Sequence, residues 1–221
     1  MSVIVIGGMI GAGKTSVAKL LGDELGSEVF FEDVDDNPLL ELFYTANEEE
    51  EQEKRYPFLL QLTFLSSRFR SIKEALGDKD NVLDRSIYED WYFSKVNNDL
   101  GRISDLEFKI YEELLDNMMQ ELEELPKKAP DLMVYLHGSF EEIIRRIGTR
   151  GRDFEQDESL MEYYRVLWQG YDDWVDQHYD ASQVLKIDID RYDVVHNPED
   201  ADEVVQMVKD ALKERDQILT N

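Results

Sequence analysis

Near the N-terminus lies a run of glycines followed by a lysine and a threonine, at a spacing that can bind phosphate. The run matches the pattern G-x-x-x-x-G-K-[ST] in full. Its residues are Gly8, Met9, Ile10, Gly11, Ala12, Gly13, Lys14 and Thr15, and Ser16 follows. In such a loop backbone N–H groups turn toward phosphate oxygens, the lysine reaches the β- and γ-phosphates, and the threonine hydroxyl can ligate Mg²⁺. The motif predicts nucleotide binding but leaves the acceptor of the phosphoryl group open.

Charged side chains follow two further apolar runs. VLDRS, residues 82–86, contains Asp84 and Arg85, and Glu32 takes the corresponding place in FFEDVDDNP, residues 30–38. Ligands bind at the carboxyl ends of strands in open α/β sheets. There Asp84 could hold Mg²⁺ through water, Arg85 could neutralise charge on the phosphoryl group, and Glu32 could take the proton of an attacking hydroxyl. A local ion pair and a turn without chemistry are the alternative interpretations.

The segment IIRRIGTRGRDFEQ, residues 143–156, is the densest cationic cluster of the chain. Its arginines are Arg145, Arg146, Arg150 and Arg152, with Gly148 and Gly151 as candidate hinges. A lid that closes arginines over the phosphates excludes water, which favours transfer to an alcohol over hydrolysis. A cluster of charges at the end of a helix is the alternative interpretation. We predict an arginine-rich lid over about residues 145–158.

Composition narrows the classes of partner. The 221 residues include 50 acidic and 24 basic side chains, a formal net charge of −26. Such a field repels nucleic acid and anionic membranes, so we expect neither as a partner. The chain has no cysteine, which excludes disulfides and a thiol nucleophile. It has no apolar run of about 18 residues and no recognisable signal peptide, and we therefore expect a cytoplasmic protein.

The elements that must position these residues follow from an alternation of short apolar runs and longer helical patterns. The predicted strands are residues 3–6, 28–31, 82–84, 132–136 and 184–189. The predicted helices are residues 15–25, 56–76, 106–125, 140–147, 159–179 and 198–215. Because the strands are apolar on both faces, helices should cover both sides of the sheet. The pattern predicts a three-layer α/β fold with a parallel sheet of about five strands in a single domain, residues 1–221, with residues 47–54 as a charged and mobile surface segment.

Four motifs in this order resemble the deoxynucleoside kinase family, which includes deoxycytidine, deoxyguanosine and deoxyadenosine kinases, and most closely its short bacterial purine-type members. The motifs are the phosphate loop, FFEDVDDNP, DRSIYEDWYF and RGRDFEQ, within a similarity over about residues 3–195. The resemblance implies a P-loop kinase fold and transfer of the γ-phosphoryl group from MgATP to the 5′-hydroxyl of a deoxynucleoside, in nucleotide salvage. It also implies a dimer, with a second copy or a sister subunit, through a bundle of helices 56–76 and 103–125, and inhibition by a deoxynucleoside triphosphate.

The resemblance also implies roles for individual residues. Glu32 would be the general base and Arg85 would position the hydroxyl, while Thr15 and Asp84 would hold Mg²⁺, partly through water. Besides the phosphate loop, the residues implied to bind ATP are Arg146, Arg150, Arg152, Arg191 and Asp193. Those implied to bind the deoxynucleoside are Glu32, Tyr44, Gln61, Arg68, Arg85, Asp90 and Glu155. Gln61 would read the base, and the flanking pair of Arg68 and Asp90 suits a purine. The family's aromatic residue that stacks on the base falls at Ser94, beside Phe93.

Two alternative functions stay open. A kinase of a nucleoside monophosphate, of the thymidylate type, would share the phosphate loop, the Asp-Arg pair and the lid. It would also need cations for the phosphate of its acceptor, and apart from Arg55 and Arg68 few basic residues lie between residues 32 and 90. A non-catalytic nucleotide-sensing module would need the phosphate loop but not Glu32, Gln61 or a lid. For the kinase, deoxyadenosine and deoxyguanosine are the expected acceptors, with deoxycytidine as a third candidate.

Overall fold

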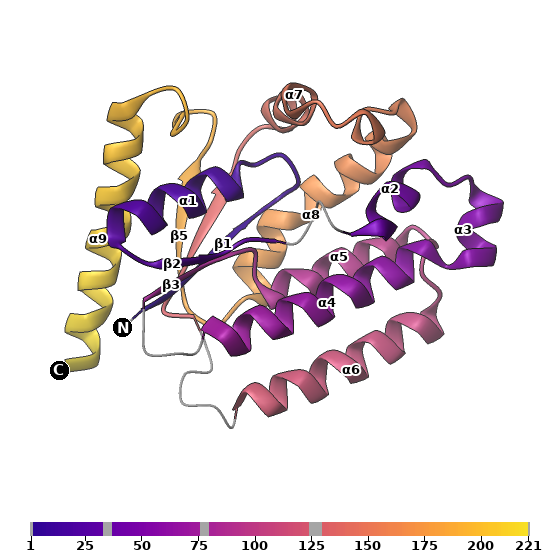
Figure 1. The fold of residues 1–221 in the computed structure, drawn as a ribbon, viewed down its shortest axis with the longest axis horizontal. Helices are drawn as coiled ribbons and strands as arrows, with labels where there is room; N and C mark the ends of the chain where they lie inside the picture. Colours follow the sequence, from indigo (N-terminus) through magenta and orange to yellow (C-terminus); the bar gives the residue numbers. More distant parts are fainter. Residues whose placement is uncertain (1, 33–36, 76–79, 124–129, 221) are drawn as a thin grey trace.

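A computed structural model describes the backbone of residues 2–32, 37–75, 80–123 and 130–220, and the side chains of the same ranges except residues 123 and 218–220 (Figure 1). Five strands form one parallel sheet in the order β2-β3-β1-β4-β5. They are β1 (Val3–Gly8), β2 (Glu28–Phe30), β3 (Asn81–Asp84), β4 (Leu132–His137) and β5 (Gln183–Asp188). The predicted parallel sheet is confirmed, with strand ends that differ by one or two residues from the prediction.

Six helices correspond to the six predicted from the sequence. They are α1 (Lys14–Leu25), α4 (Tyr56–Ala75), α6 (Asp105–Glu123), α7 (Phe140–Arg150), α8 (Met161–His178) and α9 (Pro198–Thr220). The predicted helix ends at residues 76 and 125 lie outside the described residues. Figure 1 shows α1 and α9 on one side of the sheet and α4 and α8 on the other, with α6 packed outside α4. The three-layer arrangement is thus as predicted. Among the described residues, no helix is both long and apolar enough to cross a membrane.

Three further helices were not predicted, namely α2 (Pro38–Thr45), α3 (Glu48–Lys54) and α5 (Ile87–Asp99). Helix α5 hides its apolar periodicity because it buries polar side chains, among them Glu89, Asp90 and Asn97. Because polar residues occupy buried positions, the sequence of α5 lacks the apolar repeat of 3.6 residues by which a helix is recognised.

Helix α3 occupies the segment expected to be a charged and mobile surface. It begins with a capping box between Asn47 and Glu50, which is the sequence signal for its start. Glu51 of α3 forms an ion pair with Arg102. Arg55 ends the helix and forms an ion pair with Glu107 of α6. These two ion pairs therefore hold the acidic helix against Arg102 and α6 of the same molecule.

The direction of the strands determines where the site lies. All five strands run parallel, so their carboxyl ends meet at one edge of the sheet. The phosphate loop follows β1, Glu32 lies two residues after β2, and Asp84 ends β3. Short 3₁₀ turns, Asp153–Glu155 and Glu158–Leu160, connect α7 to α8 above the same edge.

Candidate active site

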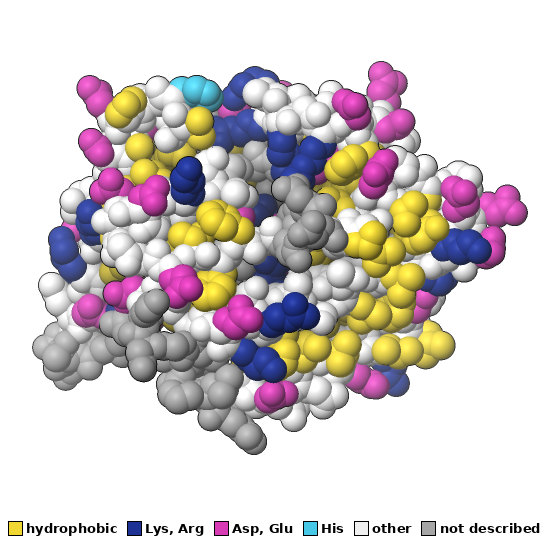
Figure 2. Space-filling model, in the orientation of Figure 1, with side chains coloured by type: hydrophobic (Ala, Val, Ile, Leu, Met, Phe, Trp, Pro, Cys, Tyr) yellow, Lys and Arg dark blue, Asp and Glu magenta, His cyan; other side chains and the backbone are white. Residues whose placement is uncertain are grey.

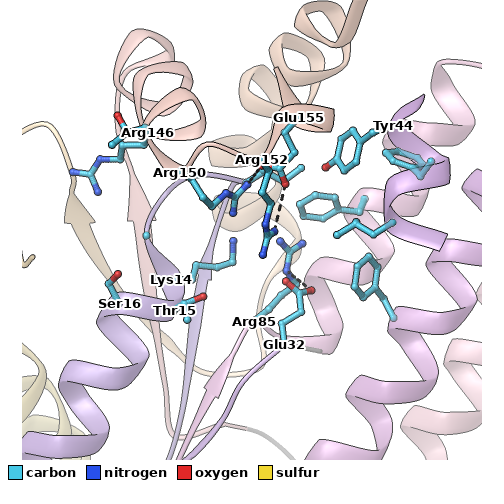
Figure 3. Close-up of a pocket in the computed structure, with 18 of the residues that line it drawn as sticks. Lys14, Thr15, Ser16, Glu32, Tyr44, Arg85, Arg146, Arg150, Arg152 and Glu155 are labelled. Carbon is cyan, nitrogen blue, oxygen red and sulfur yellow. Dashed lines mark hydrogen bonds and ion pairs between the residues drawn. The ribbon is translucent and has the colours of Figure 1, made fainter. Parts of the chain in front are cut away.

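A cleft of about 470 Å³ opens at the carboxyl edge of the sheet (Figure 3). Most of the residues predicted for the site line it. They are Ile10, Gly11, Gly13, Lys14, Thr15, Ser16, Glu32, Tyr44, Gln61, Arg85, Asp90, Arg146, Arg150, Arg152, Glu155 and Asp193. In Figure 2 lysine and arginine side chains gather around the hollow in the upper part of the view. The cleft is therefore a local concentration of positive charge on an acidic molecule, as a polyanionic ligand requires.

The phosphate loop has the backbone that its glycines allow. Gly13 has a φ of 95°, a left-handed conformation, and a Cβ on Gly8 would lie 2.7 Å from the carbonyl oxygen of Leu136. The Nζ of Lys14 donates to the carbonyl oxygens of Gly8 (2.8 Å) and Met9 (3.0 Å). Burial lowers the pKa of this ammonium to about 8. The lysine is thus held across its own loop, where it can exchange these carbonyls for phosphate oxygens.

Thr15 and Asp84 offer oxygen ligands at the base of the loop. The Thr15 hydroxyl donates to Oδ2 of Asp84 at 2.6 Å. Asp84 is 2% exposed, and within the described part of the chain its Oδ1 is buried and accepts no hydrogen bond. A buried carboxylate oxygen without a partner is costly, and a cation would satisfy it. No group of three or more His, Asp or Glu residues in the described ranges could hold a metal by itself. The pair therefore fits Mg²⁺ that takes its remaining ligands from nucleotide and water.

Glu32 lies between two guanidinium groups. Arg68 donates to its Oε1 at 2.8 Å, and Nε of Arg85 lies 3.2 Å from the same oxygen. Arg68 also pairs with Asp90, with Nε and Oδ2 3.3 Å apart, and donates to the carbonyl oxygen of Asp84 at 2.9 Å. Arg68 is buried and is not among the residues that line the cleft. It therefore supports Glu32 and Asp90 from behind.

The two carboxyl groups of this network have opposite pKa shifts. Burial alone would raise the pKa of Glu32, but the charges of Arg85, Arg68 and Lys14 outweigh it and lower the pKa to about 2. For Asp90 burial prevails over the two arginines and raises the pKa to about 6. Glu32 is accordingly ionised at neutral pH, whereas the pKa of Asp90 lies about one unit below neutral pH.

Arg85 has a strained backbone. Its φ of 85° lies in the left-handed region, which side chains other than glycine rarely adopt. Its N–H donates to the carbonyl oxygen of Ile6 at 3.0 Å, and its guanidinium lies 4.3 Å from the ring centre of Phe93. Strain of this kind concentrates at functional sites, where the surrounding structure enforces it.

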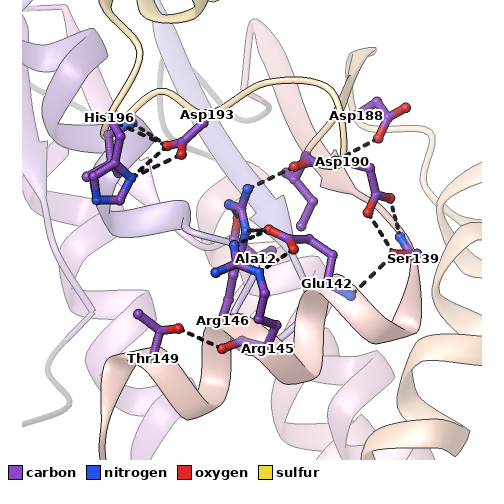
Figure 4. A network of polar contacts seen from close by, with 12 residues as sticks. Ala12, Ser139, Glu142, Arg145, Arg146, Thr149, Asp188, Asp190, Asp193 and His196 are labelled. Carbon is purple, nitrogen blue, oxygen red and sulfur yellow. Dashed lines mark hydrogen bonds and ion pairs between the residues drawn. The ribbon is translucent and has the colours of Figure 1, made fainter.

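Arg145 of α7 pairs with Glu142 on its own helix, and the other three arginines of the segment divide into two groups. Arg146 lies against the phosphate loop, donating to the carbonyl oxygens of Ala12 (3.3 Å) and Ile189 (2.8 Å), as Figure 4 shows. Arg150 and Arg152 both pair with Glu155, a buried carboxylate. In the segment expected to form a lid, Arg146 therefore contacts the phosphate loop, whereas Arg150 and Arg152 form ion pairs within the segment itself.

The opposite end of the cleft is aromatic and apolar. Tyr44 of α2 lines it and stacks on Phe154, with ring centres 5.6 Å apart. Gln61 of α4 is buried there, and Phe93 lies on the same wall while Ser94 does not line the cleft. An aromatic wall with one buried amide suits a flat heterocycle that needs both stacking and hydrogen bonds.

Some expected residues lie elsewhere. Arg191 is absent from the described lining of the cleft and pairs instead with Glu203 at 3.3 Å. Gly8, Met9 and Ala12 belong to the loop without lining the cleft, so they act through its backbone. The sequence analysis did not single out several of the lining residues, namely Leu40, Phe43, Leu60, Phe64, Thr149, Tyr163, Val195 and His196. They lie outside the four motifs or within apolar helix patterns, so no signal in the sequence marked them.

Comparison with known proteins decides among the kinases that share this geometry. The sequence profile described as "Deoxynucleoside kinase" matches residues 4–213. The chain belongs to the deoxynucleoside kinase family. A deoxyguanosine kinase of Lactobacillus johnsonii is 48% identical over 217 residues, which cover 97% of this chain and 94% of the relative. A deoxyadenosine kinase of Lactobacillus acidophilus is 42% identical over 217 residues, covering 97% and 98%.

Solved structures of the family have the same fold. The deoxyadenosine kinase from M. mycoides with bound dATP aligns with a TM-score of 0.77 at 27% identity, over 94% of this chain and 99% of that chain. The same kinase with the products dCMP and a flexible dCDP aligns with a TM-score of 0.79 at 26% identity and the same coverage. The family membership inferred from four motifs is confirmed, and the monophosphate-kinase and sensor alternatives are not favoured.

Proposed function

We propose that this deoxynucleoside kinase transfers the γ-phosphoryl group of ATP to the 5′-hydroxyl of a purine deoxynucleoside, deoxyadenosine or deoxyguanosine. The observation that carries the proposal is the ionised Glu32 held beside Arg85 in the cleft that also contains the phosphate loop. Support for a purine comes from the relatives named deoxyguanosine and deoxyadenosine kinase, at 42–48% identity. Deoxycytidine is a third candidate acceptor, since a relative at 36% identity is a deoxyadenosine/deoxycytidine kinase.

The phosphates of ATP would lie in the loop between Lys14 and Arg146. Lys14 already stretches across the loop, and Arg146 touches it from α7. Thr15 and Asp84 would hold Mg²⁺, which when bound neutralises charge on the β- and γ-phosphates. Asp193, with the neighbouring Val195 and His196, lines the cleft and would contact the donor nucleotide.

Glu32 and Arg85 would act on the acceptor hydroxyl. The hydroxyl would donate to the Glu32 carboxylate, which orients its oxygen toward the γ-phosphorus and takes the proton as the new bond forms. A carboxylate with a pKa of about 2 is a weak base. In the loose transition state of phosphoryl transfer it is needed for position first and for the proton late. Arg85 fixes the carboxylate and offsets the charge that develops on the phosphoryl group.

The remaining acceptor contacts would come from four side chains. Gln61 would bond the base edge and Asp90, backed by Arg68, would bond a donor on the far ring of a purine. Tyr44 and Glu155 would bind the sugar 3′-hydroxyl. At present Glu155 forms ion pairs with both Arg150 and Arg152. To bind the sugar it would have to give up one of these pairs, and the arginine released would turn to the phosphates. That exchange would couple acceptor binding to closure of the lid.

A second copy of the chain is the proposed partner. Leu106, Ile110 and Leu114 follow one another at four-residue spacing on α6 and are 69%, 47% and 37% exposed, and Leu59 of the adjacent α4 is 39% exposed. Figure 2 shows hydrophobic side chains gathered on the side of the molecule where α4 and α6 lie. A contiguous apolar face of this kind favours pairing into a helical bundle. Light scattering of the purified chain should give twice its mass, and Ile110→Glu should give the single mass. A monomeric wild type would favour a sister subunit instead.

The substrate is tested by ATP consumption with Mg²⁺ and one acceptor at a time. Deoxyadenosine, deoxyguanosine, deoxycytidine, thymidine and dTMP are the informative set. Turnover with a purine deoxynucleoside is the expected result. Turnover with dTMP alone would establish a monophosphate kinase, and no stimulation by any acceptor would leave a nucleotide-sensing role as the better description.

A further inference from the structure

One fully buried carboxylate near the site has no part in the mechanism described above. Glu89, in the first turn of α5, is 0% exposed and does not line the cleft. Its Oε1 accepts hydrogen bonds from the N–H of Gly8, at 2.9 Å, and from the hydroxyl of Tyr171. Its Oε2 accepts from the N–H of Ser86, at 2.9 Å. Within the described residues no lysine or arginine forms an ion pair with it, and its three hydrogen bonds come from neutral donors.

These three donors belong to three separate parts of the fold. Gly8 is the first residue of the phosphate loop, Ser86 directly follows Arg85, and Tyr171 lies on α8. The hydrogen bond to Ser86 is half of a capping box that starts α5. Capping explains Oε2 only, because a helix start gains nothing from a bond to a loop on another strand. The bond from Oε1 to Gly8 therefore calls for a second explanation.

The strained turn at Arg85 supplies that explanation. The Arg85 N–H is fixed to Ile6 of β1, and the next N–H, that of Ser86, is fixed to Glu89. A left-handed arginine persists only when both of its sides are held. Because the same carboxylate also holds Gly8, one side chain ties the phosphate loop to the turn that carries Arg85 beyond the point where the pairing of β1 and β3 ends. Through the 3.2 Å ion pair of Arg85 it also supports one of the two contacts that hold Glu32.

We propose that Glu89 is a positioning residue for phosphoryl transfer, which fixes the phosphate loop relative to Arg85 and Glu32. The inference rests on the proposed function, since it concerns the alignment of donor and acceptor in that reaction. Glu89 is buried and does not line the cleft, so both substrates should still bind when it is changed. Alignment of the reacting atoms should suffer instead, because a misplacement of about 1 Å can cost about 100-fold in rate.

The test compares three variants in steady-state kinetics. Glu89→Gln keeps the size but turns one acceptor into a donor that faces an N–H. Glu89→Asp keeps the carboxyl group but is too short to reach both Gly8 and Ser86. Tyr171→Phe is the matched control, since it removes one buried hydrogen bond to the same carboxylate and leaves both backbone bonds in place. Each variant is assayed well below its melting temperature.

We expect both Glu89 variants to lose about 100-fold in kcat with KM values for ATP and acceptor within about threefold of the wild type. Tyr171→Phe should keep kcat within about threefold although its melting temperature falls. If Glu89→Gln does not fold, Glu89→Asp carries the same prediction, since it retains the cap. Recovery of kcat in Glu89→Asp, or an equal loss of kcat in Tyr171→Phe, would overturn the inference. A wild type without turnover would instead refute the proposed function.

Discussion

The raised pKa of Asp90 predicts how stability depends on pH. The carboxyl has an ordinary pKa of 3.8 in the unfolded chain and about 6 in the folded protein, because its burial outweighs Arg68 and Arg85. Between these values the folded state keeps a proton that the unfolded state has lost. That advantage disappears as the pH rises through about 6. Stability should therefore fall across this window, which is the reverse of the usual behaviour of a paired carboxylate.

The magnitude follows from the same two values. At about 1.4 kcal/mol per pH unit, Asp90 should lower the free energy of unfolding by about 3 kcal/mol between pH 4 and pH 7. Asp90→Asn removes this titration and leaves Arg68 its bonds to Glu32 and to the Asp84 carbonyl. Urea unfolding at half-unit steps from pH 4 to pH 8 should give a wild-type curve that falls relative to that of Asp90→Asn. The exposed Asp173→Asn serves as the charge-matched control. Curves of wild type and Asp90→Asn that stay parallel would refute the reasoning.

Two further variants test other parts of the site. Asp84→Asn keeps an acceptor for the Thr15 hydroxyl but loses the charge, so the Mg²⁺ concentration for half-maximal activity should rise at least about tenfold, as a titration at fixed ATP would show. An unchanged Mg²⁺ requirement would remove Asp84 from the metal site. Arg102 packs 4.1 Å from the ring centre of Phe43 and donates to its carbonyl oxygen at 3.0 Å, behind the aromatic wall. Arg102→Gln should raise the KM for the acceptor several-fold and leave the KM for ATP unchanged, whereas Arg55→Gln, which loses only an outer ion pair, should change neither. Equal effects of the two variants would contradict this.

The sheet and the phosphate loop could be predicted because their signals are local. Each strand is a short run of apolar residues, and the loop is one contiguous motif between a strand and a helix. Glu32 and Asp84 were placed at the edge of the sheet because parallel strands bring their carboxyl ends together. This prediction uses only the direction of the strands and does not require the contacts between distant side chains.

The contacts that the sequence did not reveal are those between distant elements. Arg68 was expected to bind the acceptor beside Asp90, and the sequence did not reveal its contact with Glu32, which depends on how α4 crosses the end of β2. From the sequence Glu89 is an ordinary polar helix residue, and only the fold places the N–H of Gly8 beside its carboxyl group. Arg191 sits in the expected loop, but its side chain pairs with Glu203 of α9. Tertiary packing decides each of these, and no spacing along the chain reports it.

The central claim is that Glu32 serves the chemical step of phosphoryl transfer, and Glu32→Gln tests it most directly. Glutamine keeps an oxygen that can accept from Arg68 but cannot take a proton. The measurement is kcat with a purine deoxynucleoside, together with dissociation constants of ATP and acceptor by calorimetry. If Glu32 serves the chemical step, kcat should fall by about 10²–10⁴-fold while both ligands still bind. A variant that binds both ligands and retains the wild-type kcat would contradict it.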